Sequence, residues 1–376
     1  MSRRAGVVKP VRMKDIAKDL GVSAVTVSKV LRGHADISRA TRRRVMKRVK
    51  ELNYRPNWIA QSLVTKRTWI IGLVIPDLMH SFFAEIAKGV ALAIRPKGYH
   101  LLISNTDGDE AVEKEEIETL VARRVDGLII ASRQRTGETE LFERVRGSGV
   151  PFVMVERRIR DIDAPYVGWK QTDLGVMATE HLIERGCRMI AHIRGPEIET
   201  GIGRLEGYQK ALERRGIQVP SSYIVSGSYG DGTGYDAMKK LLSLSPRPDS
   251  VFCYKDPVGA YAIKAILDAG LRVPEDIAVM GIGNVQYSDF LRVPLSTIDQ
   301  SSRSMGQQSA ELLMRLMDSS GRREPKVILI PPKLLAREST ARELQLTNTP
   351  VAPVDRQEQV LDTTPARGRI LEVPLR

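Results

Sequence analysis

A run of small and polar side chains between residues 13 and 32 has the composition of a surface that recognises base edges. The members of the run are Ser23, Ala24, Val25, Thr26, Ser28, Lys29 and Arg32. Hydroxyl groups can form hydrogen bonds with base edges, an ammonium group can contact a guanine or a phosphate, and methyl groups can contact the methyl group of thymine. Such chemistry needs a narrow element that exposes these side chains and buries its opposite face.

Two short helices are expected to position these side chains. Apolar residues recur at helical spacing on one face of residues 13–20 and again on one face of residues 24–31. Gly21 can end the first helix because glycine adopts the left-handed conformation at low cost, and Ser23 can cap the second. The pattern is typical of a helix-turn-helix that enters the major groove of DNA, and equally of an ordinary helical hairpin. The predicted inward residues are Met13, Ile16, Ala17 and Leu20, followed by Val27, Val30 and Leu31.

The distribution of charge distinguishes these two interpretations. The net charge is +13, and residues 1–67 hold 18 Lys or Arg against Asp15, Asp19, Asp36 and Glu51, a surplus of 14. The remainder of the chain is therefore balanced to within one charge. A basic segment beside a neutral one indicates a polyanionic partner such as nucleic acid, the alternative being a solvated basic face.

Two further segments follow the hairpin. Ser38 is expected to cap a helix from about Thr41 to Leu52, with Val45, Met46, Val49 and Leu52 facing inward and its arginines and lysines outside. Pro56 ends this run, and residues 57–64 could form about two helical turns, which are marginal in water without a partner. By length and composition alone, this second segment reads as a linker between domains.

From residue 69 the pattern changes to short apolar runs separated by amphipathic segments. Strands are predicted at 69–75, 99–104, 126–131, 151–155, 188–193, 249–254 and 277–282. Helices are predicted near 82–95, 109–123, 138–147, 172–185, 202–215, 232–243 and 257–269. This alternation indicates parallel sheets covered on both faces, and the length favours two doubly wound α/β lobes with a ligand cleft between them.

Several classes of protein are disfavoured by composition. Cys187 and Cys253 are too few for a disulfide framework, and the five histidines show no metal-ligand spacing, so no metal site and no cofactor are expected. No apolar run is long enough to span a membrane, and the basic start lacks the features of a signal peptide, which predicts a cytoplasmic protein. Residues 1–12 and 342–376 are expected to be a disordered basic arm and a disordered tail.

The order of motifs from residue 11 to about residue 341 resembles the LacI/GalR (lactose–galactose repressor) family. The resemblance is carried by M-K-D-I-A-K-D-L-G-V-S-A-V-T-V-S-K-V-L-R-G and T-R-R-R-V-M-K-R-V-K-E-L-N-Y-R-P-N-W-I-A-Q-S-L, and later by I-G-L-V-I-P-D, R-L-E-G-Y-Q-K-A-L and V-P-E-D-I-A-V-M-G. It implies a helix-turn-helix domain (13–56), a hinge helix (57–67) and a core like periplasmic sugar-binding proteins (68–341). The expected first lobe covers about 68–167 and 296–326, and the second about 168–295 and 327–341. Leu20 departs mildly from the family, which usually has a small residue there.

The resemblance implies DNA-binding roles for matching positions. Residues 24–26, 28 and 29 occupy the face that the family uses on operator bases and phosphates. Lys29 replaces the more usual arginine, so a two-point guanine contact becomes a single-point one. Leu63 matches the leucine that wedges open the central base step, which reverses the linker interpretation of 57–64. Tyr54 and Asn57 would support the hinge.

The resemblance also implies an effector site, from which this sequence departs. Phe83, with Phe82 and Asp77 nearby, matches the aromatic residue that stacks on the ligand, and Arg204 matches the arginine that clamps it. The family's Asp-Asn pair is Lys170–Gln171 here, its Asn-Asp is Lys255–Asp256, and its Asp after the later strand is Gly283, followed by Asn284. Carboxylates that would accept hydrogen bonds from sugar hydroxyls are thus replaced by cations or absent. We therefore expect an acidic or phosphorylated sugar, or no small effector. The alternative is that Lys170 and Lys255 are solvent-exposed rim residues.

Three functions compete at this stage. The first is a homodimeric regulator, usually a repressor, that binds a palindromic operator and is controlled by a metabolite; whether dimers pair into tetramers stays open. The second is a two-lobe solute-binding protein or an enzyme, which lacks an export signal and a catalytic set respectively. The third is a regulator that a protein partner controls.

Overall fold

The computed structural model describes residues 11–55, 62, 65–134, 139–159, 161–227, 232–318 and 327–342. Most of the predicted N-terminal arm, the positions Asn57 and Leu63 of the predicted hinge helix, and the predicted tail beyond Arg342 lie outside the described residues.

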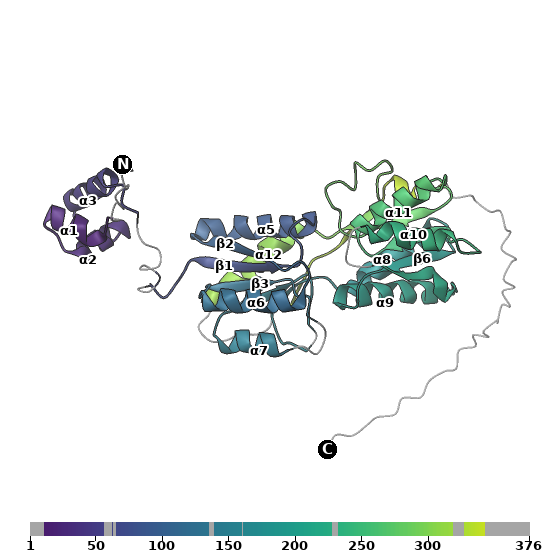
Figure 1. Cartoon of the computed structure of the whole chain (residues 1–376), viewed down its shortest axis with the longest axis horizontal. Helices are drawn as coiled ribbons and strands as arrows, with labels where there is room; N and C mark the ends of the chain where they lie inside the picture. Colours follow the sequence, from purple (N-terminus) through teal and green to yellow (C-terminus); the bar gives the residue numbers. More distant parts are fainter. Residues whose placement is uncertain are drawn as a thin grey trace, which may run out of the picture. The chain divides into compact units, whose positions relative to one another are not determined.

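The N-terminal domain is a bundle of α1 (Met13–Leu20), α2 (Ala24–Leu31) and α3 (Arg39–Glu51) (Figure 1). Gly21 ends α1 in the left-handed conformation with φ of +63°, as its position predicts. The Ser23 hydroxyl accepts a hydrogen bond from the Thr26 amide at 3.0 Å, and Ser38 accepts one from Thr41 at 3.2 Å. Both predicted N-caps are therefore confirmed, and α3 begins two residues earlier than expected.

A small apolar core holds the three helices together. Its fully buried members are Ile16, Ala17, Val27, Val30 and Val45. Met46 was expected in the same core, but its side chain is 48% exposed, so that prediction was wrong. Val45, Val49 and Leu52 share one face at spacings of four and three residues, whereas Met46 is turned about 100° away from Val45.

Lobe 1 contains a parallel sheet with strand order β11-β5-β4-β3-β1-β2. The strands are β1 (Ile70–Ile75), β2 (His100–Asn105), β3 (Gly127–Ile130), β4 (Phe152–Val155), β5 (Tyr166–Gly168) and β11 (Val327–Leu329). One face is covered by α5 (Ser81–Ile94) and α12 (Ser302–Asp318), and the other by α6 (Glu110–Ala122) and α7 (Glu140–Gly147) (Figure 1).

Lobe 2 contains a second parallel sheet with strand order β7-β6-β8-β9. Its strands are β6 (Ile190–Arg194), β7 (Ile224–Ser226), β8 (Ser250–Cys253) and β9 (Ala278–Met280). Helices α8 (Gln171–Glu184) and α9 (Glu199–Arg214) cover one face, and α10 (Thr233–Leu242) and α11 (Asp256–Asp268) cover the other. An antiparallel pair, β10 (Thr297–Asp299) with β12 (Lys333–Leu335), accompanies the return of the chain between the lobes. Short 3-10 turns are η1 (Arg95–Lys97), η2 (Ser221–Tyr223) and η3 (Glu338–Thr340).

The predicted doubly wound parallel fold is confirmed, and every core strand and helix expected from periodicity is present. One lobe assignment was wrong, because residues 327–329 form β11 beside β5 in lobe 1 and not a part of lobe 2. A three-residue apolar run carries no signal of the sheet it joins. Strand β2 was expected to be buried, yet Leu102 and Ile103 are 36% and 38% exposed because β2 lies at the sheet edge. None of the helices in the described ranges is long and apolar enough to cross a membrane.

Candidate nucleic-acid interface and interlobe cleft

The outer face of α2 presents the side chains that the sequence predicts for base recognition. Val25 is the most open apolar residue of this helix, with 62% of its surface exposed. Ser23 and Arg32 are exposed, whereas Ala24, Thr26, Ser28 and Lys29 are half-buried. Because Val27 and Val30 on the opposite face are buried in the domain core, α2 can offer only this outer face to a partner. Ala24 is an exception among the predicted residues, because it packs against the apolar core of the domain, three residues before the buried Val27.

Two of these side chains already have partners within the domain. The Thr26 hydroxyl lies 2.9 Å from that of Ser23, and Lys29 Nζ donates to Asp36 Oδ2 at 2.5 Å. The hydrogen bond from Lys29 lowers the pKa of Asp36. Lys29 must therefore leave Asp36, or share its ammonium group, before it contacts a base or a phosphate.

Part of the predicted phosphate-binding charge on α3 is used to hold the bundle. Arg48 donates to Asp19 on α1 at 2.5 Å, and Arg44 donates to the Leu20 carbonyl at 3.0 Å. Arg42 donates to the His34 carbonyl at 2.5 Å. Tyr54 is half-buried against the apolar core, where burial raises the pKa of its hydroxyl. The exposed cations that remain on this helix include Arg39, Arg43, Lys47 and Lys50.

A cleft lies where the strands of the two lobes end. It is lined from lobe 1 by Asp77, His80, Phe82, Phe83, Glu156 and Arg157, and from lobe 2 by Pro196, Ile198, Thr200, Arg204, Tyr254, Lys255, Ile282 and Gly283, with Gln300 after β10. Most of these residues follow the carboxyl ends of strands, where ligands of open parallel sheets bind. The cavity measures about 40 Å³, little more than the space of one water molecule.

Aromatic rings form the lobe 1 side of the cleft. Phe82 and Phe83 are 5% and 3% exposed and pack edge to face, with ring centroids 5.0 Å apart. The Arg157 guanidinium lies over the Phe83 ring at 5.7 Å from its centroid. A planar cation therefore occupies the ring face that the resemblance assigns to a ligand.

Arg204 on α9 forms the floor on the lobe 2 side. Its guanidinium donates to Gln171 Oε1 at 3.1 Å and to the Tyr254 carbonyl. Within the described ranges no carboxylate lies within ion-pair distance of it, and burial lowers the pKa of this arginine. Gln171 Nε2 in turn donates to the Glu156 carbonyl at 3.2 Å, so one amide side chain links Arg204 to the end of β4.

The predicted effector residues divide into two groups. Asp77, Phe82, Phe83, Arg204, Lys255 and Gly283 line the cleft, whereas Lys170, Asp256 and Asn284 do not. The Lys170 side chain is 67% exposed and lies 3.5 Å from Asp173, as the rim alternative predicts.

The other two residues are held elsewhere by hydrogen bonds. The buried Asp256 carboxylate accepts hydrogen bonds from the Val285 amide and from Ser288 and Thr297 at 2.6–3.1 Å, which corrects its assignment to the ligand site. Asn284 Oδ1 accepts a hydrogen bond from Arg337 at 2.8 Å.

Sequence reasoning missed several residues that line the cleft, among them Glu156, Arg157, Thr200, Tyr254 and Gln300. A signal was available for two of them, because Glu156 and Arg157 are charged residues directly after an apolar strand, the position where ligands of parallel sheets bind. The sequence around Gln300 gave no such signal. This residue reaches the cleft only because the chain crosses between the lobes there.

The described residues contain no group of three His, Cys, Asp or Glu side chains that could hold a metal ion, and both cysteines are buried thiols. A helix-turn-helix domain followed by a two-lobe parallel-sheet core defines a class of DNA-binding proteins.

Comparisons with known proteins identify the family. Residues 12–57 match the family model of bacterial regulatory proteins of the lacI family, and residues 179–340 match a periplasmic binding protein-like domain. The chain is 35% identical over 321 residues to the ribose operon repressor of Escherichia coli K12, covering 85% of this chain and 97% of the relative. It is 36% identical over 335 residues to the transcriptional repressor PurR of Escherichia coli O1:K1 / APEC, covering 88% and 96%.

Solved structures give the same result. The lac repressor dimer bound to operator and the anti-inducer ONPF matches with a TM-score of 0.79 at 28% identity, covering 88% of this chain and 99% of that one. The cellobiose complex of the regulator CelR matches with a TM-score of 0.67 at 30% identity, over 88% and 99% of the two chains. The chain belongs to the LacI family of DNA-binding transcriptional repressors. These relatives are repressors and not enzymes, as the sequence predicts.

Proposed function

We propose that this repressor binds a palindromic operator as a homodimer and that a small molecule in the interlobe cleft controls its affinity. The observation that carries the proposal is the exposed outer face of α2, open at Val25, in a segment that has a surplus of 14 positive charges. In this account residues 24–26, 28, 29 and 32 contact the operator, and the exposed cations of α3 contact phosphates. The site of action is the cytoplasm.

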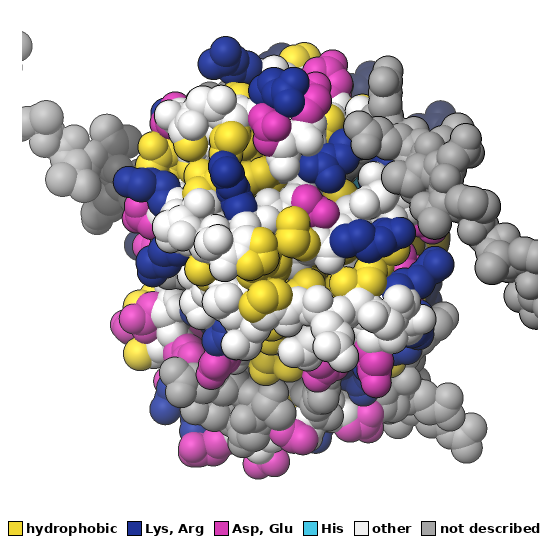
Figure 2. Space-filling view, turned by 90° about the vertical axis from the view of Figure 1, so that its right-hand side faces the viewer, with side chains coloured by type: hydrophobic (Ala, Val, Ile, Leu, Met, Phe, Trp, Pro, Cys, Tyr) yellow, Lys and Arg dark blue, Asp and Glu magenta, His cyan; other side chains and the backbone are white. Residues whose placement is uncertain are grey.

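Unpartnered apolar side chains support the homodimer. Leu92 on α5 and Leu102 and Ile103 on the edge strand β2 are exposed in lobe 1. Figure 2 views the molecule from the side of lobe 2 and shows hydrophobic side chains near the middle of that face, with Lys and Arg around them. A two-fold dimer would bury such patches and present two α2 helices to two half-sites.

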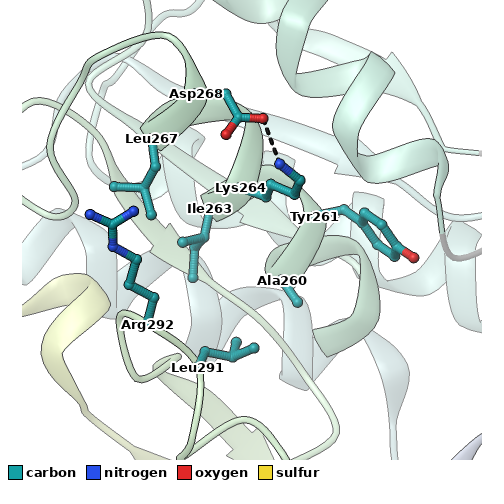
Figure 3. Close-up of a pocket in the computed structure, with 8 residues that line it drawn as sticks. All are labelled: Ala260, Tyr261, Ile263, Lys264, Leu267, Asp268, Leu291 and Arg292. Atoms are coloured by element: carbon teal, nitrogen blue, oxygen red, sulfur yellow. Dashed lines mark hydrogen bonds and ion pairs between the residues drawn. The ribbon is translucent and has the colours of Figure 1, made fainter.

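A groove on lobe 2 is a specific part of this proposed interface (Figure 3). It has a volume of about 340 Å³ and is lined by α11 residues, including Tyr261 and Leu267, and by Leu291 and Arg292 from the loop after β9. In the close-up, Lys264 pairs with Asp268 at 2.7 Å on the exposed side of α11. Tyr287 and Phe290 of the same loop are 42% and 85% exposed.

Control by the cleft follows if a ligand binds one arrangement of the lobes more tightly than the other. Two relatives support a metabolite effector, since one is a ribose operon repressor and the other, CelR, was solved as a complex with cellobiose. An acidic or phosphorylated sugar is our expectation here. Asn57 and Leu63, outside the described residues, keep their proposed roles in coupling the cleft to DNA.

A footprint of the full chain on DNA upstream of candidate genes tests the proposal. We expect a protected palindromic site and a logarithm of affinity that falls steeply with the logarithm of salt concentration. Protection without sequence preference would overturn operator recognition.

The oligomeric state is tested by sedimentation velocity. We expect a dimer, and we expect Tyr261→Asp to shift it toward monomer. Met189→Asp is the matched control, because Met189 is 38% exposed on lobe 2 but does not line the groove. A monomeric wild type that still protects both half-sites would contradict the dimer.

A further inference from the structure

We propose that Arg157 selects an anionic ligand in the interlobe cleft, and that Glu156 is an internal carboxylate that an incoming carboxylate or phosphate group replaces at this guanidinium. The inference rests on the proposed control by a cleft ligand. It deepens that control by naming the residue that recognises the expected anion and the internal carboxylate that the anion replaces.

The first observation is a buried ion pair between two residues that are adjacent in the chain. Arg157 Nε lies 2.9 Å from Glu156 Oε2, and the two side chains are 8% and 9% exposed. Glu156 has a φ of +64°, a conformation that is uncommon for residues other than glycine and that often marks functional sites. The cleft wall therefore contains a guanidinium group whose positive charge is balanced by the carboxylate of the preceding residue.

The surroundings of Arg157 fix its plane. It lies over the Phe83 ring, and its Nη1 faces the Ser132 carbonyl at 3.5 Å. The Ser132 hydroxyl donates to the buried carboxylate of Glu113 at 2.6 Å. Neither contact involves Glu156, so in this proposal both persist when the Glu156 carboxylate moves away.

The second observation is an excess of donors across the cleft. Arg204 is 3% exposed and uses an amide oxygen and a carbonyl as acceptors, so its full charge has no carboxylate partner in the described ranges. Gln300 is also 3% exposed, lines the cleft, and its Nε2 has no hydrogen-bond partner among the described residues. Lys255 adds a further cation to the lining.

Carboxylate acceptors for the hydroxyl groups of a neutral sugar are few in the cleft lining, where Thr200, Tyr254 and Gln300 supply neutral acceptors. Asp77 and Glu156 are its carboxylates, the first accepting a hydrogen bond from the Met79 amide at 2.9 Å and the second paired with Arg157. Sugar hydroxyls need acceptors as well as donors, whereas a carboxylate or phosphate needs only donors. A buried cation without a carboxylate is unfavourable, and an anionic ligand offsets this cost.

The two guanidinium groups come from opposite lobes, Arg157 after β4 and Arg204 from α9. An anion that contacts both would stabilise the closed arrangement of the lobes relative to an open one. The present cavity of about 40 Å³ is too small for a sugar acid, so binding requires side chains or lobes to move. Release of Glu156 from Arg157 is such a movement.

Thermal unfolding of the full chain tests the ligand class. The probes are gluconate and glucuronate as carboxylates, glucose 6-phosphate and ribose 5-phosphate as phosphates, and glucose and ribose as neutral controls, each up to 10 mM. We expect at least one anion to raise Tm while its neutral parent does not. Comparing the carboxylate probes with the phosphate probes then shows which of the two anionic groups binds. No shift with any anion, or an equal shift with the neutral parent, would overturn the inference.

Variants test the roles of the two residues. Arg157→Gln should lower the affinity for the anion that raises Tm at least tenfold, since a charge-assisted contact is lost. Glu156→Gln should raise the affinity for the same anion, because the side chain that competes for Arg157 becomes neutral. Lys170→Gln removes the same charge outside the cleft lining and should change nothing. An equal loss of affinity in the Glu156 and Arg157 variants would show that Glu156 binds the ligand itself. That result would overturn the proposal that the anion replaces Glu156 at Arg157.

Operator binding without ligand separates this inference from the proposed function. Wild type and Lys170→Gln, whose substitution lies outside the cleft lining, should bind the operator equally in fluorescence anisotropy. Sequence-specific binding that persists without any anion response rejects only the ligand assignment. Loss of sequence-specific binding by the wild type rejects the proposed function instead.

Discussion

Lys29 forms an ion pair with Asp36 in the domain that must contact DNA, so its charge is shared before any partner arrives. The pair is exposed, and such pairs contribute little to stability. Its consequence lies in recognition, because a base or phosphate contact must compete with a carboxylate. The same principle holds at Asp256, where three internal hydrogen bonds remove a carboxylate from the site that sequence reasoning assigned to it.

At this scale, we expect Asp36→Asn to raise affinity for non-specific DNA severalfold and to lower the ratio of operator to non-specific affinity. The substitution frees Lys29 for phosphates and removes a negative charge near the DNA. Fluorescence anisotropy with an operator duplex and a scrambled duplex measures both constants. Glu51→Gln is the charge-matched control, since it leaves Lys29 paired. An unchanged affinity ratio would show that Asp36 does not restrain Lys29.

At the scale of elements, helix α9 carries Arg204 and is placed by close packing against α8. A Cβ atom on Gly175 would lie 2.2 Å from the Arg204 carbonyl oxygen, so the two helix backbones meet where only glycine fits. The position of the guanidinium in the cleft therefore depends on a residue that does not line it. Helix α2 is placed by different means, because Gly21 ends α1 in the left-handed conformation and the Ser23 hydroxyl caps α2.

We expect Gly175→Ala to lower the free energy of unfolding by about 1–3 kcal/mol, because the added methyl group forces the helices apart. The substitution should also lower the affinity of the cleft for its ligand, while the affinity for the operator without ligand is retained. Urea unfolding and ligand titration measure the two effects. Ala178→Gly, on the same helix but without added volume, separates the loss of packing from displacement of α9. Unchanged stability of Gly175→Ala would show that the helices adjust without cost.

The proposed hinge helix gives a second prediction for an element. Leu63→Ala should weaken operator binding far more than binding to non-specific DNA, because a wedge acts only where the central base step is opened. Affinity for both duplexes, measured at one salt concentration, tests this. An equal loss of affinity for the two duplexes would show that Leu63 does not act as a wedge.

At the scale of the whole molecule, buried histidines in the core connect stability to pH. Burial lowers the pKa of His181 and of His192 to about 4. His181 contacts the Thr340 hydroxyl at 2.8 Å, and His192 stacks between Tyr208 and Phe252. Both rings are therefore neutral in the folded core at neutral pH. Burial raises the pKa of Glu113 and of Asp256, which acts in the opposite sense at acidic pH.

We expect the free energy of unfolding to fall as pH is lowered from about 6.5 toward 4. In this window the histidines of the unfolded chain bind protons that the folded core excludes, so stability rises with pH there. Each histidine contributes at most about 3 kcal/mol to this change. Urea unfolding between pH 7.5 and 4.5 measures it, and His181→Gln should flatten the curve. A steeper dependence in that variant would contradict the assignment.

The sequence by itself determined the elements and their order, because helical spacing, capping residues and apolar runs are local properties. Ser23, Gly21 and Ser38 were identified with their correct roles, and the alternation after residue 69 indicated two parallel sheets. The family resemblance placed Phe82, Phe83 and Arg204, which do line the cleft.

Only the tertiary structure decided which polar side chains already have partners, and which residues far apart in the chain meet. The Lys29–Asp36 pair, the enclosed Asp256 and the outward Lys170 depend on side-chain directions that spacing does not reveal. Residues 327–329 and Gln300 reached lobe 1 and the cleft because the chain crosses between the lobes. The pairing of Arg157 with Glu156 over Phe83 is likewise a product of packing, since a charge after a strand can turn toward solvent or toward the cleft with the same sequence.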